Sequence, residues 1–85
     1  MKTFEYTVKD EAGLHARPAG LLVKFAQGCS SDINLVFNGK TADAKRLFSV
    51  MALGAKKDNR LVFEVSGAQE EEECAKLQEF CTQNF

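Results

Sequence analysis

Apolar and polar residues alternate along several short segments of the chain. In residues 2–8, Phe4, Tyr6 and Val8 fall on one face of an extended chain and polar residues fall on the other. A period of two is typical of a strand with one buried face. The alternation predicts strands at residues 2–8, 33–37 and 61–65.

Three other segments have the 3.6-residue period of amphipathic helices. Residues 16–27 form the first, and Gly28 is a natural stop for it. Residues 47–53 form a second helix that ends at Gly54, and residues 70–82 form a third. Four glutamates at residues 70–73 begin the third helix, where acidic side chains favour the helix dipole. The predicted inner faces of the first and third helices hold Ala19, Leu22, Val23, Ala26, Cys74, Leu77 and Cys81.

The dipeptide Asn38-Gly39 is a strong signal for a β-hairpin. It predicts a short returning strand at residues 40–42, antiparallel to the strand before it. The full order is then strand, helix, strand, strand, helix, strand, helix. This order predicts an α+β fold: a four-stranded, mostly antiparallel sheet with three helices on one face. We expect residues 1–85 to form a single domain.

Composition excludes several classes of function. The chain is 45% hydrophobic and has a net charge of −1, which suits a globular protein and gives no general attraction to nucleic acid. No apolar run approaches the length of a membrane span, and the N-terminus lacks a signal-peptide layout, so we expect a cytoplasmic protein. Cys29, Cys74 and Cys81 have no metal-ligand spacing, and we expect reduced thiols and no metal.

Charge is distributed unevenly along the chain. Several basic residues precede position 47, whereas the run of glutamates comes late. If the early basic side chains converge in space, they suit an acidic protein partner. These residues are Arg17, Lys24, Lys40, Lys45 and Arg46.

His15 is the one histidine of the chain, and it immediately precedes the first predicted helix. Pro18 fits the first turn of that helix, where the missing amide would have no partner. His15 therefore lies at a helix N-terminus, which attracts anions such as phosphate. Arg17 and the backbone amides of Ala16 and Arg17 can stabilise a phosphoryl group there. The plainer interpretation is an exposed histidine that only caps the helix.

Two motifs carry a family resemblance. Gly-Leu-His-Ala-Arg-Pro-Ala at residues 13–19 resembles the active-site signature of HPr, the histidine phosphocarrier of the bacterial sugar phosphotransferase system. Residues 38–45 resemble the hairpin that leads into the second helix of that family. The resemblance covers nearly the whole chain, and the element order predicted above is that of the family's open-faced β-sandwich.

The resemblance implies a shuttle. Enzyme I, charged by phosphoenolpyruvate, passes a phosphoryl group to Nδ1 of His15, and Arg17 stabilises the phosphate. The phosphohistidine then donates the group to the IIA domain of a sugar permease. Such a protein is a carrier with a transient phosphohistidine rather than a stand-alone enzyme, and it needs no cofactor. We expect a monomer, because a small carrier must reach two partners in turn.

In the HPr family, the face of the second helix docks onto Enzyme I and the IIA domains. Leu47 and Met51 fit such a surface, and Phe48 does so less firmly. Leu21 and Phe25 lie off the predicted core face of the first helix, so contact with a partner is a hypothesis for both. Gly20 reflects either neutral drift or the close approach of a partner helix. The predicted docking residues are Gly20, Leu21, Lys24, Arg46, Leu47, Phe48 and Met51.

Position 46 departs from the family pattern. Many HPr proteins have a serine there that a dedicated kinase phosphorylates, whereas this chain has Arg46. Arginine cannot accept phosphate or cap the second helix, so we expect Asp43 to cap it and do not transfer the regulatory role to Ser49. Ala12 replaces a serine or asparagine that is common in the family, which leaves the orientation of His15 open.

Two other functions remain. One is a paralogous carrier in a regulatory, nitrogen-type phosphotransferase branch. The other is a protein-binding module that is never phosphorylated, although the pairing of His15 with Arg17 argues against it.

Overall fold

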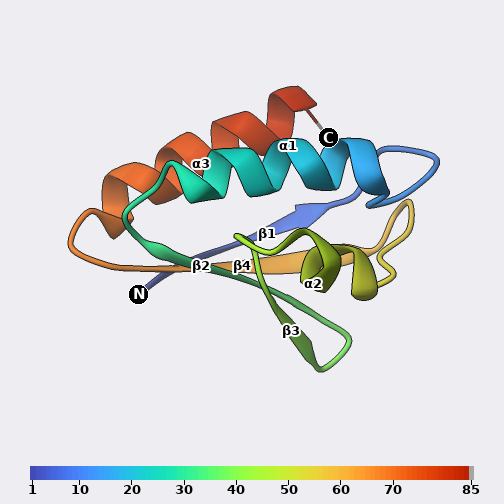
Figure 1. Cartoon of the computed structure of the whole chain (residues 1–85), viewed down its shortest axis with the longest axis horizontal. Coiled ribbons are helices and arrows are strands. Elements are labelled where there is room, and N and C mark those ends of the chain that lie inside the picture. The colour runs from blue at the N-terminus through green and yellow to red at the C-terminus, as the bar shows by residue number, and fades with distance from the viewer. Residues whose placement is uncertain (85) are drawn as a thin grey trace.

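The structure is a computed structural model that describes residues 1–84, as seven elements in the predicted order (Figure 1). The four strands form one sheet in the order β1-β4-β2-β3, and every neighbouring pair is antiparallel. The elements are β1 (Lys2–Thr7), α1 (Ala16–Gln27), β2 (Asp32–Phe37), β3 (Lys40–Asp43), α2 (Leu47–Ala52), β4 (Arg60–Ser66) and α3 (Glu70–Asn84).

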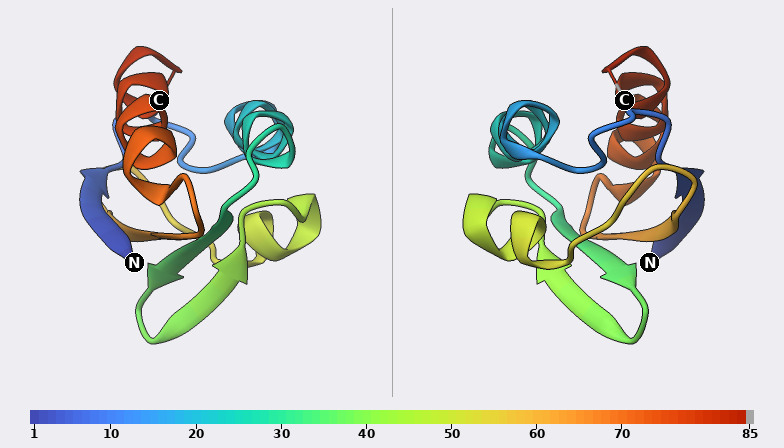
Figure 2. Two further views of the ribbon diagram at one scale, coloured as in Figure 1. Left: turned by 90° about the vertical axis from the view of Figure 1, so that its left-hand side faces the viewer. Right: turned by 90° about the vertical axis from the view of Figure 1, so that its right-hand side faces the viewer.

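The helices cover one face of the sheet and leave the other open. Figures 1 and 2 show α1 and α3 lying side by side over the sheet, with α2 next to α1 toward the β3 edge. This arrangement confirms the predicted α+β open-faced sandwich. Within residues 1–84, no helix combines the length and the apolar composition that crossing a bilayer requires.

Alternating strand residues form the floor of the core, as their period predicts. Phe63 of β4 pairs with Phe4 of β1 on one side and with Leu35 of β2 on the other. The rings of Phe4 and Phe63 stack with their centroids 4.8 Å apart. The inner faces of α1 and α3 lie over this floor. Their buried residues include all seven predicted ones: Ala19, Leu22, Val23, Ala26, Cys74, Leu77 and Cys81.

The turns agree with the sequence in two places and differ in one. Asn38 and Gly39 both have positive φ, 53° and 79°, as a two-residue hairpin of type I′ requires. Gly54 follows α2 with φ of 67°. Gly28 ends α1 as predicted, but with φ of −81°, so the left-handed conformation is not what ends the helix.

Most element boundaries differ from prediction by one or two residues. α1 has the predicted bounds, whereas β1 ends at Thr7 and α3 continues to Asn84. Val8 remains buried, and its amide donates to Asn59 O at 2.9 Å.

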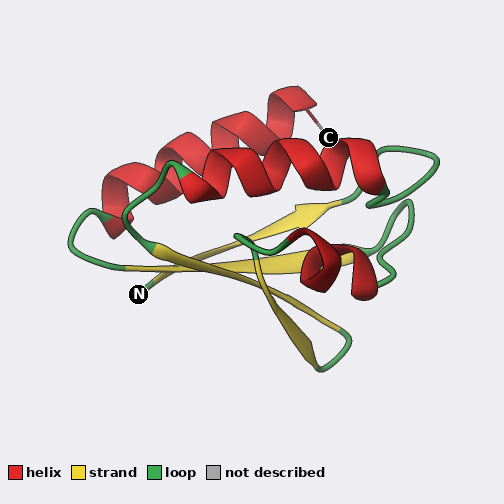
Figure 3. Ribbon diagram, viewed as in Figure 1, coloured by secondary structure: helices red, strands yellow, loops and turns green. Residues whose placement is uncertain are grey.

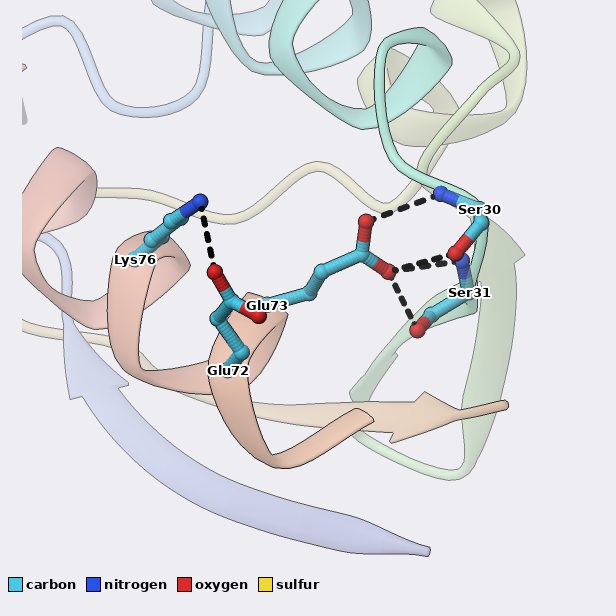
Figure 4. A network of polar contacts seen from close by, with 5 residues as sticks. All are labelled: Ser30, Ser31, Glu72, Glu73 and Lys76. Atoms are coloured by element: carbon cyan, nitrogen blue, oxygen red, sulfur yellow. Dashed lines mark hydrogen bonds and ion pairs between the residues drawn. The ribbon is translucent and has the colours of Figure 1, made fainter. Parts of the chain in front are cut away.

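The run of glutamates does more than favour a helix dipole. Glu73 is buried, with 9% of its surface exposed, and it reaches the loop between α1 and β2 (Figure 4). Its carboxylate accepts hydrogen bonds from the backbone amides of Ser30 and Ser31 at 2.9 and 2.8 Å and from both hydroxyls. The Ser31 hydroxyl and the Ser30 amide lower the pKa of Glu73 from its ordinary value of 4.5 to about 2.

Phe25 packs within the molecule, although the sequence places it off the core face of α1. Its ring stacks on Phe80 of α3, with the centroids 4.6 Å apart, and it is partly buried. Phe25 therefore joins α1 to α3 inside the molecule. The helical period of α1 predicts a surface position for Phe25 because that period takes no account of a neighbouring helix.

Candidate functional site

His15 is the N-cap residue of α1, as predicted, with extended backbone angles. Its carbonyl accepts the first hydrogen bond of the helix, from Ala19 N at 3.0 Å. In the part of the chain that the structure describes, the His15 side chain makes no capping hydrogen bond. Because Pro18 has no amide hydrogen, the donors of the first turn are those of Ala16 and Arg17, and both residues are exposed.

The loop between β1 and α1 fixes the position of His15 (Figure 3). Leu14 is buried, and its amide donates to Ala55 O at 2.9 Å. Gly13 has φ of 74°, and a Cβ there would lie 2.6 Å from Ala55 O. Only glycine fits this close approach, so the residues before His15 are held against the loop that follows α2.

Asp10 is the site residue that the sequence analysis missed. Its Oδ2 lies 3.5 Å from His15 Nε2, while its Oδ1 accepts a hydrogen bond from Ala12 N at 2.9 Å. The Ala12 amide, and after it the charges of His15 and Arg17, lower the pKa of Asp10. An aspartate that starts a four-residue turn ending in glycine is the signal that was available. The orientation of the His15 ring is open in the sequence because Ala12 replaces a serine or asparagine. In the structure, the side chain beside the ring is Asp10.

A depression of about 360 Å³ lies beside His15. It brings the start of α1 together with the last residues of α3, which end on the same side of the molecule (Figure 1). Sequence reasoning missed the α3 residues because nothing local places them near His15. The depression is lined by Asp10, His15, Arg17, Pro18, Leu21, Gln83 and Asn84.

The predicted docking residues differ in exposure. Phe48 is 83% exposed and Leu21 43% exposed. Leu47 and Met51 are partly buried and pack against the core, so of the three residues expected to face solvent on this helix only Phe48 is exposed. α2 has only six residues, and Val50 is its one buried residue. Leu47 and Met51, which flank Val50 along the helix, therefore also pack partly against the core.

The remaining predicted residues of α1 are accessible. Lys24 is exposed in its last turn, and a Cβ added to Gly20 would meet no atom within 4 Å. Lys45, one of the early basic residues, donates from Nζ to Cys29 O at 3.2 Å. Gln27 Nε2 in turn donates a hydrogen bond to Lys45 O at 3.1 Å. These two bonds join the end of α1 to the segment that precedes α2.

Arg46 is the N-cap residue of α2 and makes no side-chain capping bond within the described residues. The expectation that Asp43 caps this helix is wrong. Asp43 Oδ1 accepts from Lys45 N at 2.9 Å, and its carbonyl accepts from Arg46 N at 3.0 Å. Asp43 therefore stabilises the turn before the helix, and the Arg46 side chain stays 78% exposed, 3.9 Å from that carboxylate.

Solved structures of known proteins have the same fold. HPr from Thermoanaerobacter tengcongensis is 34% identical to this chain, with a TM-score of 0.92, and the match covers 100% of this chain and 96% of that one. The phosphocarrier protein HPr from Bacillus anthracis is 30% identical over 89% of this chain and 90% of its own, with a TM-score of 0.82. The Bacillus subtilis catabolite repression protein Crh, a swapped dimer, is 30% identical over 99% and 97%, with a TM-score of 0.77.

The sequence match agrees with the structural one. Residues 2–83 match the family described as "PTS HPr component phosphorylation site". That match includes the whole of the β1–α1 loop and all but the last residue of α3. The chain therefore belongs to the HPr family of phosphocarriers of the phosphotransferase system.

Proposed function

We propose that this protein accepts a phosphoryl group from phospho-Enzyme I on Nδ1 of His15 and passes it to IIA domains of sugar permeases. The observation that carries the proposal is the placement of His15. Its side chain is 40% exposed, makes no capping hydrogen bond within the described residues, and shares a depression with Arg17. An incoming phosphoryl group can reach the ring and the first-turn amides together.

The transfer needs little covalent machinery. The lone pair of Nδ1 attacks phosphorus as the bond to the donor breaks, and the reverse displacement delivers the group to the next partner. Such reactions depend mainly on positioning and on stabilising the charge of the phosphoryl oxygens. The guanidinium of Arg17 and the amides of Ala16 and Arg17 serve this purpose, since charge-assisted bonds to phosphate are strong.

The partners dock next to the depression. Leu21 of α1 and Phe48 of α2 are the exposed large apolar residues of the two adjacent helices, and we call them the docking pair. Leu21 lines the depression itself, and exposed apolar residues near a charged site suit partners that must bind and leave in turn. The other proposed docking residues, which lie in or at the start of these two helices, are Gly20, Lys24, Arg46, Leu47 and Met51.

We expect the protein to act in the cytoplasm as a monomer, without metal or cofactor. Dimers are known for relatives, including one structure of HPr from Thermoanaerobacter tengcongensis. A dimer of this chain that stays intact while it carries phosphate would contradict the monomeric carrier.

Arg46 bears on regulation and on the branch served. Without a serine at this position, we propose that transfer to His15 is not gated by phosphorylation there. A paralogous carrier of a regulatory, nitrogen-type branch is the second candidate. Comparing phosphorylation rates with Enzyme I of the sugar branch and of the nitrogen branch separates the two.

The test uses Enzyme I and phosphoenolpyruvate labelled in its phosphoryl group. The wild type should take up acid-labile, alkali-stable label, and His15→Ala should take up none. Arg17→Ala should be labelled more slowly while unfolding at nearly the same temperature, because an exposed arginine contributes little to stability. No label on the wild type, or equal label on His15→Ala, would reject the proposal.

A further inference from the structure

We propose that Asp10 is a positioning residue for phosphoryl transfer: its carboxylate holds the Nε2 edge of His15 and leaves Nδ1 as the nucleophile. The inference deepens the proposed function and rests on it. It concerns the tautomer of the imidazole, which decides which nitrogen has a free electron pair. It assigns a role to a residue outside the motif at residues 13–19.

The two oxygens of Asp10 are divided between two partners. Oδ1 accepts the hydrogen bond from Ala12 N at 2.9 Å, which closes the side chain onto its own turn. Oδ2 then lies 3.5 Å from His15 Nε2. A carboxylate accepts hydrogen bonds and donates none, so it favours the tautomer that carries its hydrogen on Nε2. The electron pair of that tautomer is on Nδ1.

The turn that carries Asp10 is braced from within and from the neighbouring loop. Gly13 N donates to Asp10 O at 2.9 Å, and Gly13 is locked by its φ of 74° and its closeness to Ala55. On the other side, Val8 exchanges hydrogen bonds with the β-turn before β4, from Asp58 N at 2.8 Å and to Asn59 O at 2.9 Å. The carboxylate and the ring are therefore presented to each other by backbone that is fixed at both ends.

The same contact favours the phosphorylated state. When Nδ1 forms its bond to phosphorus, the hydrogen stays on Nε2 and the ring becomes an imidazolium. Asp10 then faces a positive charge, and the separation of 3.5 Å can shorten to that of a charge-assisted bond. On discharge, the Nδ1–phosphorus bond breaks and its electrons return to Nδ1, so a neutral ring with its hydrogen on Nε2 leaves. Arg17 offsets the repulsion between Asp10 and the phosphoryl oxygens.

The size of the effect follows from exposure. The side chains of Asp10 and His15 are 41% and 40% exposed, so water screens the pair and its free energy is modest. Exposed pairs of this kind interact weakly, so we expect a change in rate of about fivefold at most.

Asp10→Asn is the sharpest variant because Ala12 N orients the new amide. The asparagine Oδ1 keeps the bond to Ala12 N, which places the Nδ2 hydrogens toward His15 Nε2. A donor at this place favours a lone pair on Nε2 and the hydrogen on Nδ1, the tautomer that cannot attack through Nδ1. Asp10→Ser also keeps an oxygen that can accept from Ala12 N, but the shorter serine side chain does not reach the His15 ring.

Glu11→Gln is the matched control. It removes the same charge one residue away, from a side chain that is 90% exposed and lies 3.8 Å from Lys57 Nζ. Its carboxylate belongs to the same loop, so general effects of loop charge appear in both variants. An effect that acts through the His15 ring appears in Asp10→Asn alone.

Two measurements test the inference on the same samples. Nitrogen NMR of the one histidine reports the tautomer, and rapid-mix labelling by phospho-Enzyme I reports the transfer rate. We expect Asp10→Asn to shift the ring toward the Nδ1-hydrogen tautomer and to slow transfer about fivefold, with Asp10→Ser slowed less and Glu11→Gln unchanged.

An unchanged tautomer in Asp10→Asn, or equal slowing in Glu11→Gln, would overturn the role of Asp10 even if the wild type is labelled normally. If the wild type takes no label, the proposed function fails separately, and the NMR spectrum alone decides whether Asp10 orients His15.

Discussion

Ser31 donates both its backbone amide and its hydroxyl to one oxygen of Glu73, Oε1. Ser31 is fully buried in the loop immediately before β2, and Glu73 lies in the first turn of α3. The pair therefore fixes α3 against the loop that leaves α1 (Figure 4). Since the far end of α3 lines the depression beside His15, this contact helps to define the site from the opposite end of the helix.

Glu73→Gln should lower the free energy of unfolding by about 2 kcal/mol, because a neutral amide weakens charge-assisted bonds and turns a donor toward the Ser30 amide. The wild-type contribution is present above the unfolded pKa of 4.5. It is lost as pH falls from 4.5 toward the folded pKa of about 2. Urea unfolding between pH 7 and pH 3 measures both effects.

Glu72→Gln is the control for this prediction. Glu72 is an exposed neighbour that pairs only with Lys76, at 3.1 Å, among the ion pairs of residues 1–84. Its loss should change stability by no more than about 0.5 kcal/mol. Equal losses in the two variants would show that burial of Glu73 is not what matters.

Gly20→Ala distinguishes the two explanations left for this glycine. A Cβ at position 20 meets nothing within 4 Å, so alanine should raise the free energy of unfolding by about 0.5–1 kcal/mol. Neutral drift predicts unchanged transfer from Enzyme I. Close approach of a partner predicts slower transfer by a more stable protein. A destabilised variant would contradict the open space.

The features that the sequence predicts depend on neighbouring residues, whereas most of those it misses depend on residues far apart in the chain. His15, Arg17 and Pro18 are neighbours, so their placement at a helix start followed from local rules of capping and of proline. Glu73 meets Ser31 from 42 residues away, and no periodicity of either segment encodes that meeting. The period of α1 alone predicts Phe25 off the core face, because its neighbour Phe80 belongs to a helix far away in the sequence. Predicting the place of Asp10 requires both the conformation of its turn and the close contact of Gly13 with Ala55.

Substitution by alanine should affect Phe48 and Phe25 in opposite ways. Phe48→Ala should leave stability within about 0.5 kcal/mol of wild type, since the side chain is 83% exposed. It should slow transfer from Enzyme I about tenfold if Phe48 anchors the partner. Phe25→Ala should lose about 2 kcal/mol of stability through its stack on Phe80. Normal transfer by Phe48→Ala would remove Phe48 from the docking pair.

Because position 46 is arginine, we expect that the serine kinase that acts on many HPr proteins does not phosphorylate this protein. Incubation with such a kinase and ATP should give no phosphoserine, because arginine has no hydroxyl and Ser49 lies inside α2. Arg46→Ser supplies the hydroxyl at the exposed start of the helix and should become a substrate. Stoichiometric phosphoserine on the wild type, located by mass spectrometry, would contradict this account of position 46.

The central claim is that His15 carries phosphate between two partners, and a complete relay tests it most directly. Enzyme I, labelled phosphoenolpyruvate, this protein and a IIA domain are mixed, and the label on each protein is followed with time. We expect label to appear on this protein first and then on the IIA domain, with none reaching the IIA domain when His15→Ala replaces the wild type. Label that reaches the IIA domain equally with His15→Ala, or that never leaves the wild-type protein, would contradict the claim.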